Sequence, residues 1–374
     1  MSGSENERPT VAVMGGGHAA FAHAADLGVQ GFDLRLFEVP ALAETIAGAK
    51  EAGGIHCQPD PTTGLTAGFG QVNLVTTDPA AALDGADIAF IVVPAFAHRS
   101  FAQLIAPHVS PDQILVLSPG NFGGSVMFAR WLKEFGCDEL PYLAEAQSMI
   151  YACRKDSPTS VNIFGYKRGL RMAVFPATHT DGVIQRLRQV FPTLEAAPNV
   201  LWTWLSNPNA IIHPPVTILN AGRIENTLGD FLFYVQGVTP AVRRVLDALD
   251  AERLALGQAL GLELMGQHEM GMTWYGHQGY EDEASPDKAR NPVYHAIKAE
   301  GELDSRYLTE DVPYGLVPWE ELANLVGMEI PICTALINLA NSLLGKDFRA
   351  TGQTLERVGL AGMSVAEIRA MVEG

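Results

Sequence analysis

The 374-residue chain lacks any apolar run near the roughly 18 residues of a membrane span. It also lacks a basic excess, because 25 lysines and arginines stand against 42 aspartates and glutamates, for a net charge of -17. This disfavours nucleic acids and anionic membrane surfaces as partners. Cys57, Cys137, Cys153 and Cys333 have no paired spacing, and the polar start MSGSENERPT does not have the pattern of a signal peptide. We therefore expect a reduced, cytoplasmic protein with no nucleic-acid or membrane partner.

What the chain does have is 47% hydrophobic residues and enough length for two cores. In the first half, apolar runs such as TVAVMGGG, FDLRLFE and DIAFIVVPA alternate with helical stretches. DIAFIVVPA is apolar almost throughout, as expected for a strand whose sheet is covered on both faces. This alternation predicts an α/β fold, with an N-terminal Rossmann dinucleotide-binding domain over residues 1–190.

The pattern changes to helices after about residue 198. Residues 239–261 have the apolar spacing of a helix, and Thr239 has the position of its N-cap. Near the C-terminus, Ser364 is followed three residues later by Glu367, which is the pattern of a capping box. We expect a mostly α-helical second domain over residues 191–374.

The stretch VAVMGGGHAA places Gly15, Gly17 and Ala20 in a G-x-G-x-x-A pattern between a strand and a helix. The first glycine makes the tight turn, the second admits a pyrophosphate, and the third small residue lets helix and strand pack. Glu38 ends the next strand about 20 residues on, where a carboxylate can bond ribose hydroxyls. This placement predicts NAD as cofactor, and NADP stays open because Arg35 lies close to Glu38 in the sequence. A glycine-rich turn beside a surface glutamate is the structural alternative.

Two later strand ends break into proline and small residues, in IVVPAFAHRS and VLSPGNFGG. Ligands of open α/β sheets bind beyond the carboxyl ends of the strands. Pro94, Pro119 and Gly120 are therefore candidates to line the cofactor, and Asn121 is a candidate to bind substrate. Ordinary turns at strand ends explain the same residues equally well.

The apolar stretch SNPNAIIHPPVTILNAG carries one histidine, His213, which two prolines follow. The prolines predict that His213 lies at a helix start or a kink. Because the stretch opens the second domain, we expect His213 to face a cleft above the nucleotide. A hydride-transfer enzyme needs a group there that gives or takes a proton, and histidine titrates near neutral pH. A core histidine with one hydrogen bond is the alternative.

The polar segment DSRYLTEDVPYGLVPWEEL can supply a partner, since a carboxylate commonly orients such a histidine. It contains Glu310 and Asp311, and the sequence does not decide between them. Its Arg306 is suited to bind a substrate carboxylate through two hydrogen bonds, although a solvated surface loop is the alternative. Trp274 is a candidate for an amino-acid pocket or for simple packing. The histidines near it lack consistent ligand spacing, so we expect no metal site.

Together these segments resemble the opine dehydrogenases of the octopine and nopaline type, over nearly the whole chain. The specific segments are NPNAIIHPPVTILNAGRIE and RYLTEDVPYGLVP, whereas many dehydrogenases share the glycine turn. The resemblance implies a Rossmann domain followed by a helical domain like the C-terminal domain of 6-phosphogluconate dehydrogenase. It also implies a catalytic histidine–aspartate pair, which matches His213 and Asp311, and a substrate-binding arginine, which matches Arg306.

The resemblance further implies a reaction, the NAD(P)H-dependent condensation of an amino acid amine with a 2-oxo acid such as pyruvate. Loss of water gives an imine, and hydride reduces it to a secondary amine. A 2-oxo acid or 2-hydroxy acid reductase of the same fold and a non-catalytic NADH sensor stay open as alternatives. We expect amino acid and 2-oxo acid substrates as partners, and a homodimer.

Overall fold

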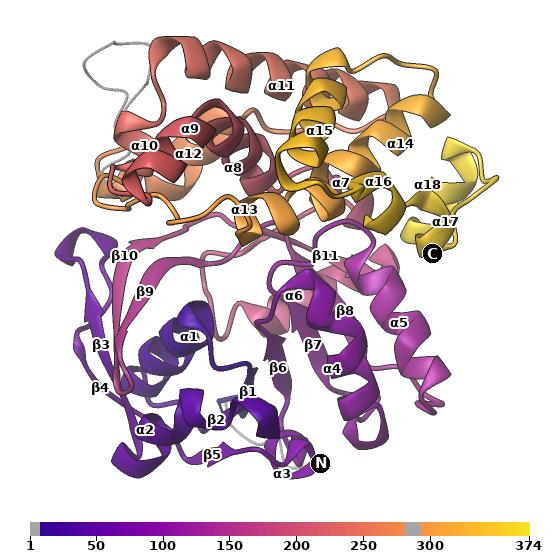
Figure 1. The fold of residues 1–374 in the computed structure, drawn as a ribbon. Helices are drawn as coiled ribbons and strands as arrows, with labels where there is room; N and C mark the ends of the chain where they lie inside the picture. Colours follow the sequence, from indigo (N-terminus) through magenta and orange to yellow (C-terminus); the bar gives the residue numbers. More distant parts are fainter. Residues whose placement is uncertain (1–7, 281–292) are drawn as a thin grey trace. The chain divides into compact units, whose positions relative to one another are not determined.

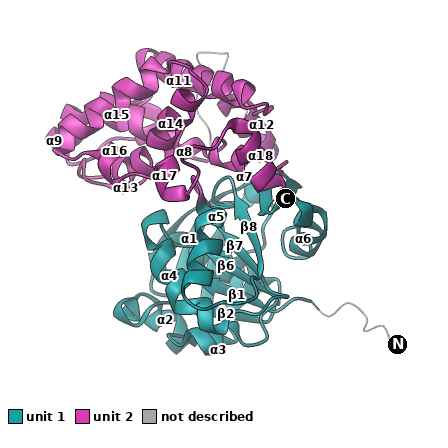
Figure 2. Ribbon diagram, turned by 90° about the vertical axis from the view of Figure 1, so that its right-hand side faces the viewer, with its two compact units in different colours: residues 1–119, 124–196 teal, residues 120–123, 197–374 magenta. Residues whose placement is uncertain are grey.

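The computed structural model describes residues 8–280 and 293–374. The chain divides into two compact units, which Figure 2 shows in teal and magenta. Unit 1 comprises Met1–Pro119 and Gly124–Ala196, and unit 2 comprises Gly120–Gly123 and Ala197–Gly374. The main boundary therefore follows Ala196, compared with residue 190 in the sequence-based expectation, and the short segment Gly120–Gly123 belongs to unit 2.

Unit 1 is built on an eight-stranded sheet in the order β12-β11-β8-β7-β6-β1-β2-β5 (Figure 1). The strands are β1 (Val11–Met14), β2 (Leu34–Phe37), β5 (Leu74–Thr76), β6 (Ile88–Ile91), β7 (Ile114–Leu117), β8 (Tyr142–Ala146), β11 (Arg171–Phe175) and β12 (Glu195–Ala196). Six neighbouring strands of this sheet run parallel, in the order β8, β7, β6, β1, β2 and β5. Strand β11, on the other side of β8, is antiparallel to it. This topology confirms the predicted Rossmann domain.

Both faces of this sheet are covered, which explains why its strands are apolar throughout. On β6, Ala89 and Ile91 join a core cluster with residues of α4 (His98–Ile105) and α5 (Gly124–Glu134). The residue between them, Phe90, points the other way and packs against His23 of α1 (His18–Val29). Because successive side chains of a strand point to opposite faces of the sheet, α4 and α5 cover one face and α1 covers the other.

A second, four-stranded sheet in unit 1 was not predicted from the sequence. Its order is β4-β3-β10-β9. The strands are β3 (Gly54–Pro59), β4 (Gly68–Gln71), β9 (Tyr151–Ser157) and β10 (Ser160–Tyr166), and α2 (Glu44–Ala52) precedes them. Strand β4 meets α1 backbone to backbone, because a Cβ added to Gly28 would lie 2.6 Å from the carbonyl oxygen of Gln71, and one on Gly70 would lie 2.2 Å from that of Ala25.

In its described residues, unit 2 is helical apart from one isolated β-bridge, Leu232 to Lys298. Its helices are α7 (Val200–Trp204), α8 (Pro208–Leu219), α9 (Ala221–Thr227), α10 (Phe233–Gln236), α11 (Pro240–Ala259), α12 (Gln267–Tyr275), α13 (Arg306–Thr309), α14 (Val317–Leu325), α15 (Pro331–Leu344), α16 (Phe348–Thr351), α17 (Leu355–Val358) and α18 (Val365–Glu373). The predicted caps are confirmed, since Thr239 caps α11 and Ser364 forms a capping box with Glu367.

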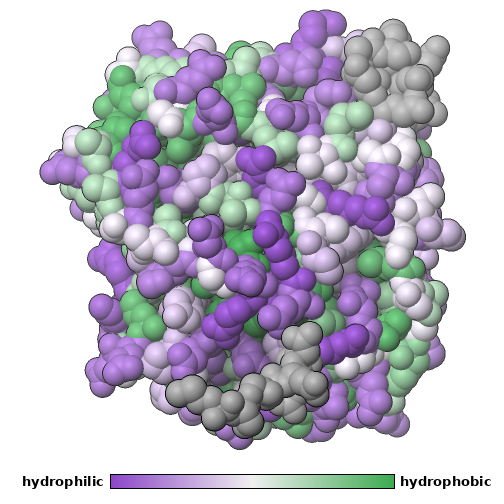
Figure 3. Space-filling view, turned by 180° about the vertical axis from the view of Figure 1, so that it is seen from behind, coloured by the Kyte–Doolittle hydropathy of each residue, from purple (hydrophilic) through white to green (hydrophobic). Residues whose placement is uncertain are grey.

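Within residues 8–280 and 293–374, no helix combines the length and apolarity that crossing a membrane requires. The face in Figure 3 is mostly polar, with apolar residues in small separate groups. Large apolar side chains are nevertheless exposed at a few positions, among them Leu339 and Leu343 of α15. These two lie four residues apart and therefore on one side of their helix.

Gly28→Ala should lower the free energy of unfolding by about 1–3 kcal/mol, because the new methyl group would force apart the backbones of α1 and β4. Gly182→Ala is the matched control, since Gly182 also lies in a helix, α6 (Thr180–Leu187), and has nothing within 4 Å of an added Cβ. The control should be stabilised by about 0.4–1 kcal/mol. Urea denaturation followed by circular dichroism measures both, and equal effects would contradict the close approach.

Candidate functional site

The glycine turn after β1 has a conformation that only glycine adopts easily. Gly15 has φ +129°, and a Cβ on it would lie 2.6 Å from the carbonyl oxygen of Val92, just after β6. Its own N–H donates to the carbonyl oxygen of Phe37 at 2.8 Å. The turn is thus held against both neighbouring strands, and any larger residue would displace it.

The N-terminus of α1 is open toward an anion. Gly17 is the N-cap residue, no side chain caps the helix, and nothing lies within 4 Å of a Cβ added to Gly17. Ala20 is fully buried one turn into the helix, where a small residue lets α1 lie close to the sheet. Because no side chain caps it, this helix start is suited to a phosphate, whose charge the helix dipole favours.

Glu38 lies directly after β2 and holds the middle of the glycine turn. Its Oε2 accepts the N–H of Gly16 at 2.7 Å, and its Oε1 accepts the N–H of Val39 at 2.7 Å. Burial raises the pKa of the Glu38 carboxyl, although these two hydrogen bonds and the charge of Lys155 oppose that rise. Its position is where a carboxylate contacts the ribose of a dinucleotide.

Lys155 is a cation near Glu38 that the sequence did not reveal. It comes from β9, and its Nζ donates to the carbonyl oxygen of Thr45 at 2.5 Å and lies 3.5 Å from the centre of the Phe21 ring. The turn after β9 packs closely on α2, since a Cβ added to Gly48 would lie 2.6 Å from the Cβ of Pro158. No local pattern marks this lysine, because it reaches Glu38 across 117 positions of the chain.

Arg35, in contrast, points away from the glycine turn. Its guanidinium donates to the backbone carbonyl oxygens of Ala81, Ala82 and Asp84, in and after α3 (Pro79–Leu83). The arginine that left NADP open in the sequence is therefore engaged elsewhere, and Lys155 is the cation beside Glu38.

The candidates at the two later strand ends lie in different surroundings. Pro94 is exposed and begins a short 3₁₀ turn after β6. Pro119 is buried in unit 1 after a cis peptide bond from Ser118, whereas the next residue, Gly120, is buried in unit 2. Their role in binding a cofactor stays a prediction.

His213 lies in the middle of α8, so of its two predicted positions, a helix start or a kink, the helix start is wrong. The helix starts at Pro208, is capped by the Asn207 side chain, and continues through Pro214 and Pro215. Prolines inside a helix remove hydrogen-bond donors. Here the surrounding burial of α8 holds the helical path, since both prolines and His213 are buried.

Three groups fix the His213 ring. Its Nδ1 is 2.7 Å from Oδ2 of Asp311, and both side chains are 7% exposed. Its Nε2 is 2.9 Å from the hydroxyl of Tyr234, which the sequence analysis did not identify. The Tyr307 ring stacks on its face, with centroids 4.0 Å apart and planes 16° from parallel. Since a carboxylate only accepts, Asp311 selects the ring form whose proton is on Nδ1.

The structure places Asp311, and not Glu310, against His213. Asp311 begins a π-helical turn, Val312–Leu316, that packs closely on α8, because a Cβ on Gly315 would lie 2.6 Å from the Cβ of Ala210. Such turns are rare and are often found at functional sites. Because Gly315 has no side chain, the turn can lie close to α8. This close packing brings the Asp311 carboxylate to His213, although the two residues are 98 positions apart in the sequence.

Glu310 instead lies with two asparagines. Asn207 donates from Nδ2 to Oδ1 of Asn121 at 2.7 Å, and Asn121 donates from Nδ2 to Oε1 of Glu310 at 3.4 Å. Asn121 has φ +56°, a left-handed conformation that asparagine tolerates better than most residues. The predicted substrate residue Asn121 is therefore part of a polar cluster within unit 2.

Arg306, at the start of α13, has an exposed side chain in the same region. Loss of surrounding water lowers the pKa of its guanidinium, but Tyr307, Glu310, Asp311 and Tyr234 together raise it above its ordinary value. Arg306 therefore keeps its positive charge close to the His213–Asp311 pair.

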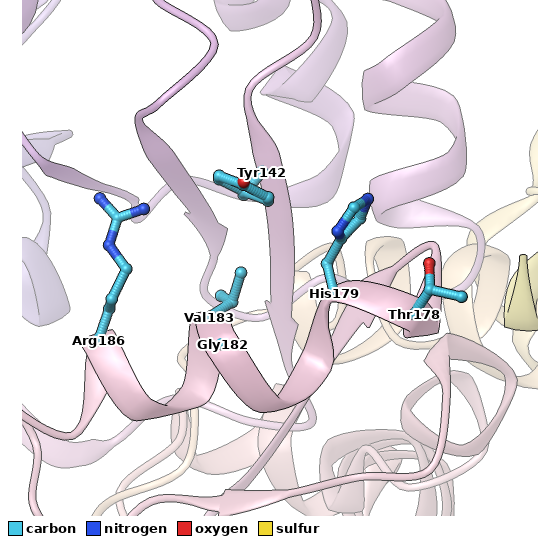
Figure 4. Close-up of a pocket in the computed structure, with 6 residues that line it drawn as sticks. All are labelled: Tyr142, Thr178, His179, Gly182, Val183 and Arg186. Carbon is cyan, nitrogen blue, oxygen red and sulfur yellow. The ribbon is translucent and has the colours of Figure 1, made fainter.

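Trp274 is 3% exposed in α12 and packs edge-on to Tyr275. Its predicted contact with substrate stays untested. The pocket in Figure 4 lies in unit 1 and contains none of the predicted site residues; it is lined by Tyr142, Thr178, His179, Gly182, Val183 and Arg186.

A Rossmann unit with an open glycine turn, joined to a helical unit that holds a buried histidine–aspartate pair, defines a nucleotide-dependent dehydrogenase. A family model described as NAD/NADP octopine/nopaline dehydrogenase, alpha-helical domain, matches residues 196–344. An opine dehydrogenase of Arthrobacter sp. (strain 1C) is 36% identical over 98% of this chain and 99% of its own. The octopine dehydrogenase of Mizuhopecten yessoensis is 28% identical over 96% of this chain and 94% of its own.

Solved structures agree in fold. Octopine dehydrogenase in complex with NADH and agmatine has a TM-score of 0.76 at 22% identity, with 98% of each chain covered. A PanE/ApbA family ketopantoate reductase from Ralstonia eutropha has a TM-score of 0.58 at 17% identity, with 90% of this chain and 99% of its own covered. The chain belongs to the octopine/nopaline dehydrogenase family of NAD(P)-dependent oxidoreductases, which confirms the predicted family and fold.

Acid should destabilise the fold because two buried histidines of unit 1 resist protonation. Burial lowers the pKa of His23 and of His98 from 6.5 to about 4. Because the folded pKa is the lower one, this stability is fully present above about pH 6.5 and is lost as the pH falls toward 4. Each histidine should account for a loss of about 2 kcal/mol at pH 5.

Urea denaturation between pH 7.5 and pH 5 measures this loss. His98→Gln removes one of the two titrations while keeping a polar side chain near Val93, whose backbone His98 contacts. The variant should lose stability less steeply with falling pH than the wild type. An unchanged slope would show that His98 is not the group that takes up the proton.

Proposed function

We propose that this chain is an opine dehydrogenase that uses NAD(P)H to join the amine of an amino acid to a 2-oxo acid such as pyruvate. The observation that carries the proposal is the buried Asp311–His213 pair, in a chain that belongs to the octopine/nopaline dehydrogenase family. Structures of octopine dehydrogenase hold NADH with L-arginine, agmatine or pyruvate, and a yersinopine dehydrogenase holds NADP+. These complexes support the two substrate classes and the nicotinamide coenzyme.

The residues of unit 1 fit a dinucleotide. The open side of Gly17 and the uncapped N–H groups of α1 provide a place for the pyrophosphate. Glu38 accepts ribose hydroxyls with a carboxylate that Gly16 already orients. Pro94 and Gly120 remain our candidates for the nicotinamide end. When bound, the reduced nicotinamide supplies the hydride that reduces the C=N bond.

His213 moves the protons of the condensation. An amino acid arrives as an ammonium ion at neutral pH, and its nitrogen must lose a proton before it attacks the ketone carbon. The lone pair of Nε2, which the Tyr234 hydroxyl contacts in the neutral ring, takes this proton, and the resulting imidazolium returns one to the hydroxyl that leaves as water. Asp311 accepts the Nδ1–H throughout and stabilises the charge that the ring carries between the two transfers.

Arg306 binds a substrate carboxylate, because its charge is retained and its side chain is exposed near the pair. Asn121 contributes amide hydrogen-bonding groups, and Trp274 contributes an apolar wall for the amino acid side chain. Asn121 is held by Asn207 on one side and by Glu310 on the other, which fixes the direction of its amide.

The cellular setting and the assembly are also inferences. All four cysteines are buried free thiols, and burial raises the pKa of Cys57 to about 12, which fits a reducing compartment such as the cytoplasm. The exposed Leu339 and Leu343 on one side of α15 favour a homodimer through the helical unit. Light scattering after size-exclusion chromatography decides the assembly.

The first test is NADH oxidation with pyruvate and each common amino acid, against pyruvate alone. Oxidation should require the amine, and in that assay His213→Asn should lower kcat by about 10²–10⁴-fold. NADH binding, followed by its fluorescence, should not change, because the substitution leaves all of the proposed coenzyme residues in place. His268→Asn is the control, since His268 lies in α12 and its ring contacts that of Tyr280 rather than the Asp311–His213 pair.

Other outcomes of this assay identify the alternatives. Oxidation with pyruvate alone would make the chain a reductase of simple 2-oxo acids. NADH binding without turnover on any pair would favour a sensor. If the His213→Asn variant kept the kcat of the wild type, His213 would not be the catalytic acid–base.

Glu38→Gln should raise the preference for NADPH over NADH about tenfold, measured as the ratio of the two kcat/KM values. The change removes a negative charge that repels a 2′-phosphate and leaves Lys155 as a cation close by. Isothermal titration with 2′,5′-ADP and ADP should show the same change in binding alone. Adding Lys155→Met should cancel the gain, and a gain that survives would show that Lys155 does not meet the phosphate.

A further inference from the structure

Nε2 of His213, the atom that must exchange protons with the substrate, already has a partner in this structure. The hydroxyl of Tyr234 lies 2.9 Å from it, on the opposite side of the ring from Asp311. No local pattern predicts this contact, because Tyr234 lies 21 residues after His213 on another helix, α10.

Tyr234 is firmly placed. Its ring stacks on Tyr294, with centroids 4.8 Å apart and planes 27° from parallel, and the hydroxyl of Tyr294 lies 2.7 Å from that of Tyr275. The preceding residue, Phe233, is fully buried and packs in one cluster with Tyr307 and residues of α8 and α11. The position of the hydroxyl beside Nε2 is therefore fixed by the core of unit 2 rather than by a mobile surface side chain.

We propose that Tyr234 is a positioning residue of the acid–base assembly, which holds Nε2 of His213 and stabilises the ring in its protonated state. The proposal rests on the function proposed above. It adds a third polar group to the Asp311–His213 pair, and it gives the assembly a hydrogen-bond partner for each ring nitrogen.

The chemistry follows from what each group can donate. In the neutral ring Nε2 has only a lone pair, because Asp311 holds the proton on Nδ1, so the tyrosine hydroxyl must donate. In the imidazolium Nε2–H becomes the donor, and the same tyrosine oxygen accepts. A hydrogen bond from a charged donor is roughly twice as strong as a neutral one. Tyr234 therefore favours the protonated ring, and phenylalanine at this position cannot.

Three charged side chains near His213 come from one segment of the described residues, namely Arg306, Glu310 and Asp311. Asp311 touches the ring, and Arg306 and Glu310 lie in the same turn of chain, where Arg306 interacts electrostatically with both acids and with Tyr234. The part of α11 that packs here contributes apolar Val242 and Leu246. Removing one hydroxyl from Tyr234 leaves all of these charges in place.

The test is the titration of His213 in substrate-free enzyme labelled with ¹⁵N-histidine, with its signal assigned by its loss in His213→Asn. In Tyr234→Phe the midpoint should fall by about half to one pH unit. Tyr294→Phe is the matched control, because it removes the hydroxyl of the stacked neighbour without touching His213. Its titration should coincide with that of the wild type.

Kinetics provide the second readout. In Tyr234→Phe the acid limb of the kcat/KM profile for the amine should move to lower pH, and kcat should fall about tenfold with the KM for NADH unchanged. An unchanged His213 midpoint in Tyr234→Phe, or an equal fall in Tyr294→Phe, would overturn the inference. Wild-type enzyme that turns over no amine would instead refute the proposed function, and the titration would still decide the role of Tyr234.

Discussion

The hydrogen bond between Asp311 and His213 is the constraint on which the helical unit depends. A carboxylate and an imidazole, each 7% exposed, have lost most of their water, and each must find its partner inside the protein. The partners lie 98 residues apart, so the bond forms only when α8 and the π-helical turn after α13 are packed together. Breaking it would leave a buried carboxylate without its ring partner, which is costly.

Close packing at glycine residues helps to bring Asp311 and His213 together. Gly315 lets the π-helical turn touch Ala210, and Gly28 and Gly70 let α1 meet β4 in the other unit. In both places the approach is closer than any Cβ allows. These close contacts at glycines let the chain segments that carry the polar groups come together.

Local chemistry explains which features the sequence predicted. Some features depend only on residues a few positions apart, as in the glycine turn and the helix caps Thr239 and Ser364. Their patterns can therefore be recognised in the sequence alone. The strands of the main sheet were predicted because both faces are buried, which makes each a continuous apolar run. The family resemblance then selected Asp311, a choice that spacing alone did not provide.

Long-range packing explains what was missed. The two prolines after His213 predicted a helix start or a kink, but α8 begins at Pro208 and stays helical through both prolines. Glu310 and Asp311 are neighbours of the same chemical type, and only the path of the chain after α13 turns one toward His213 and the other toward Asn121. The second sheet pairs β3 with β10 across about a hundred residues, for which no local pattern exists.

The two units use carboxylates in the same way. Glu38 and Asp311 are each buried and each accept N–H groups, from Gly16 and Val39 in one case and from the His213 ring in the other. A hydrogen bond from a neutral donor orients a carboxylate but leaves its charge in place. In the case of Asp311, the negative charge can then attract the positive charge that the His213 ring acquires when it takes up a proton. An interaction that strengthens only when the ring becomes charged lowers the barrier rather than merely stabilising the resting state. This is why a buried aspartate that holds a neutral histidine is better suited to catalysis than one already neutralised by a buried arginine.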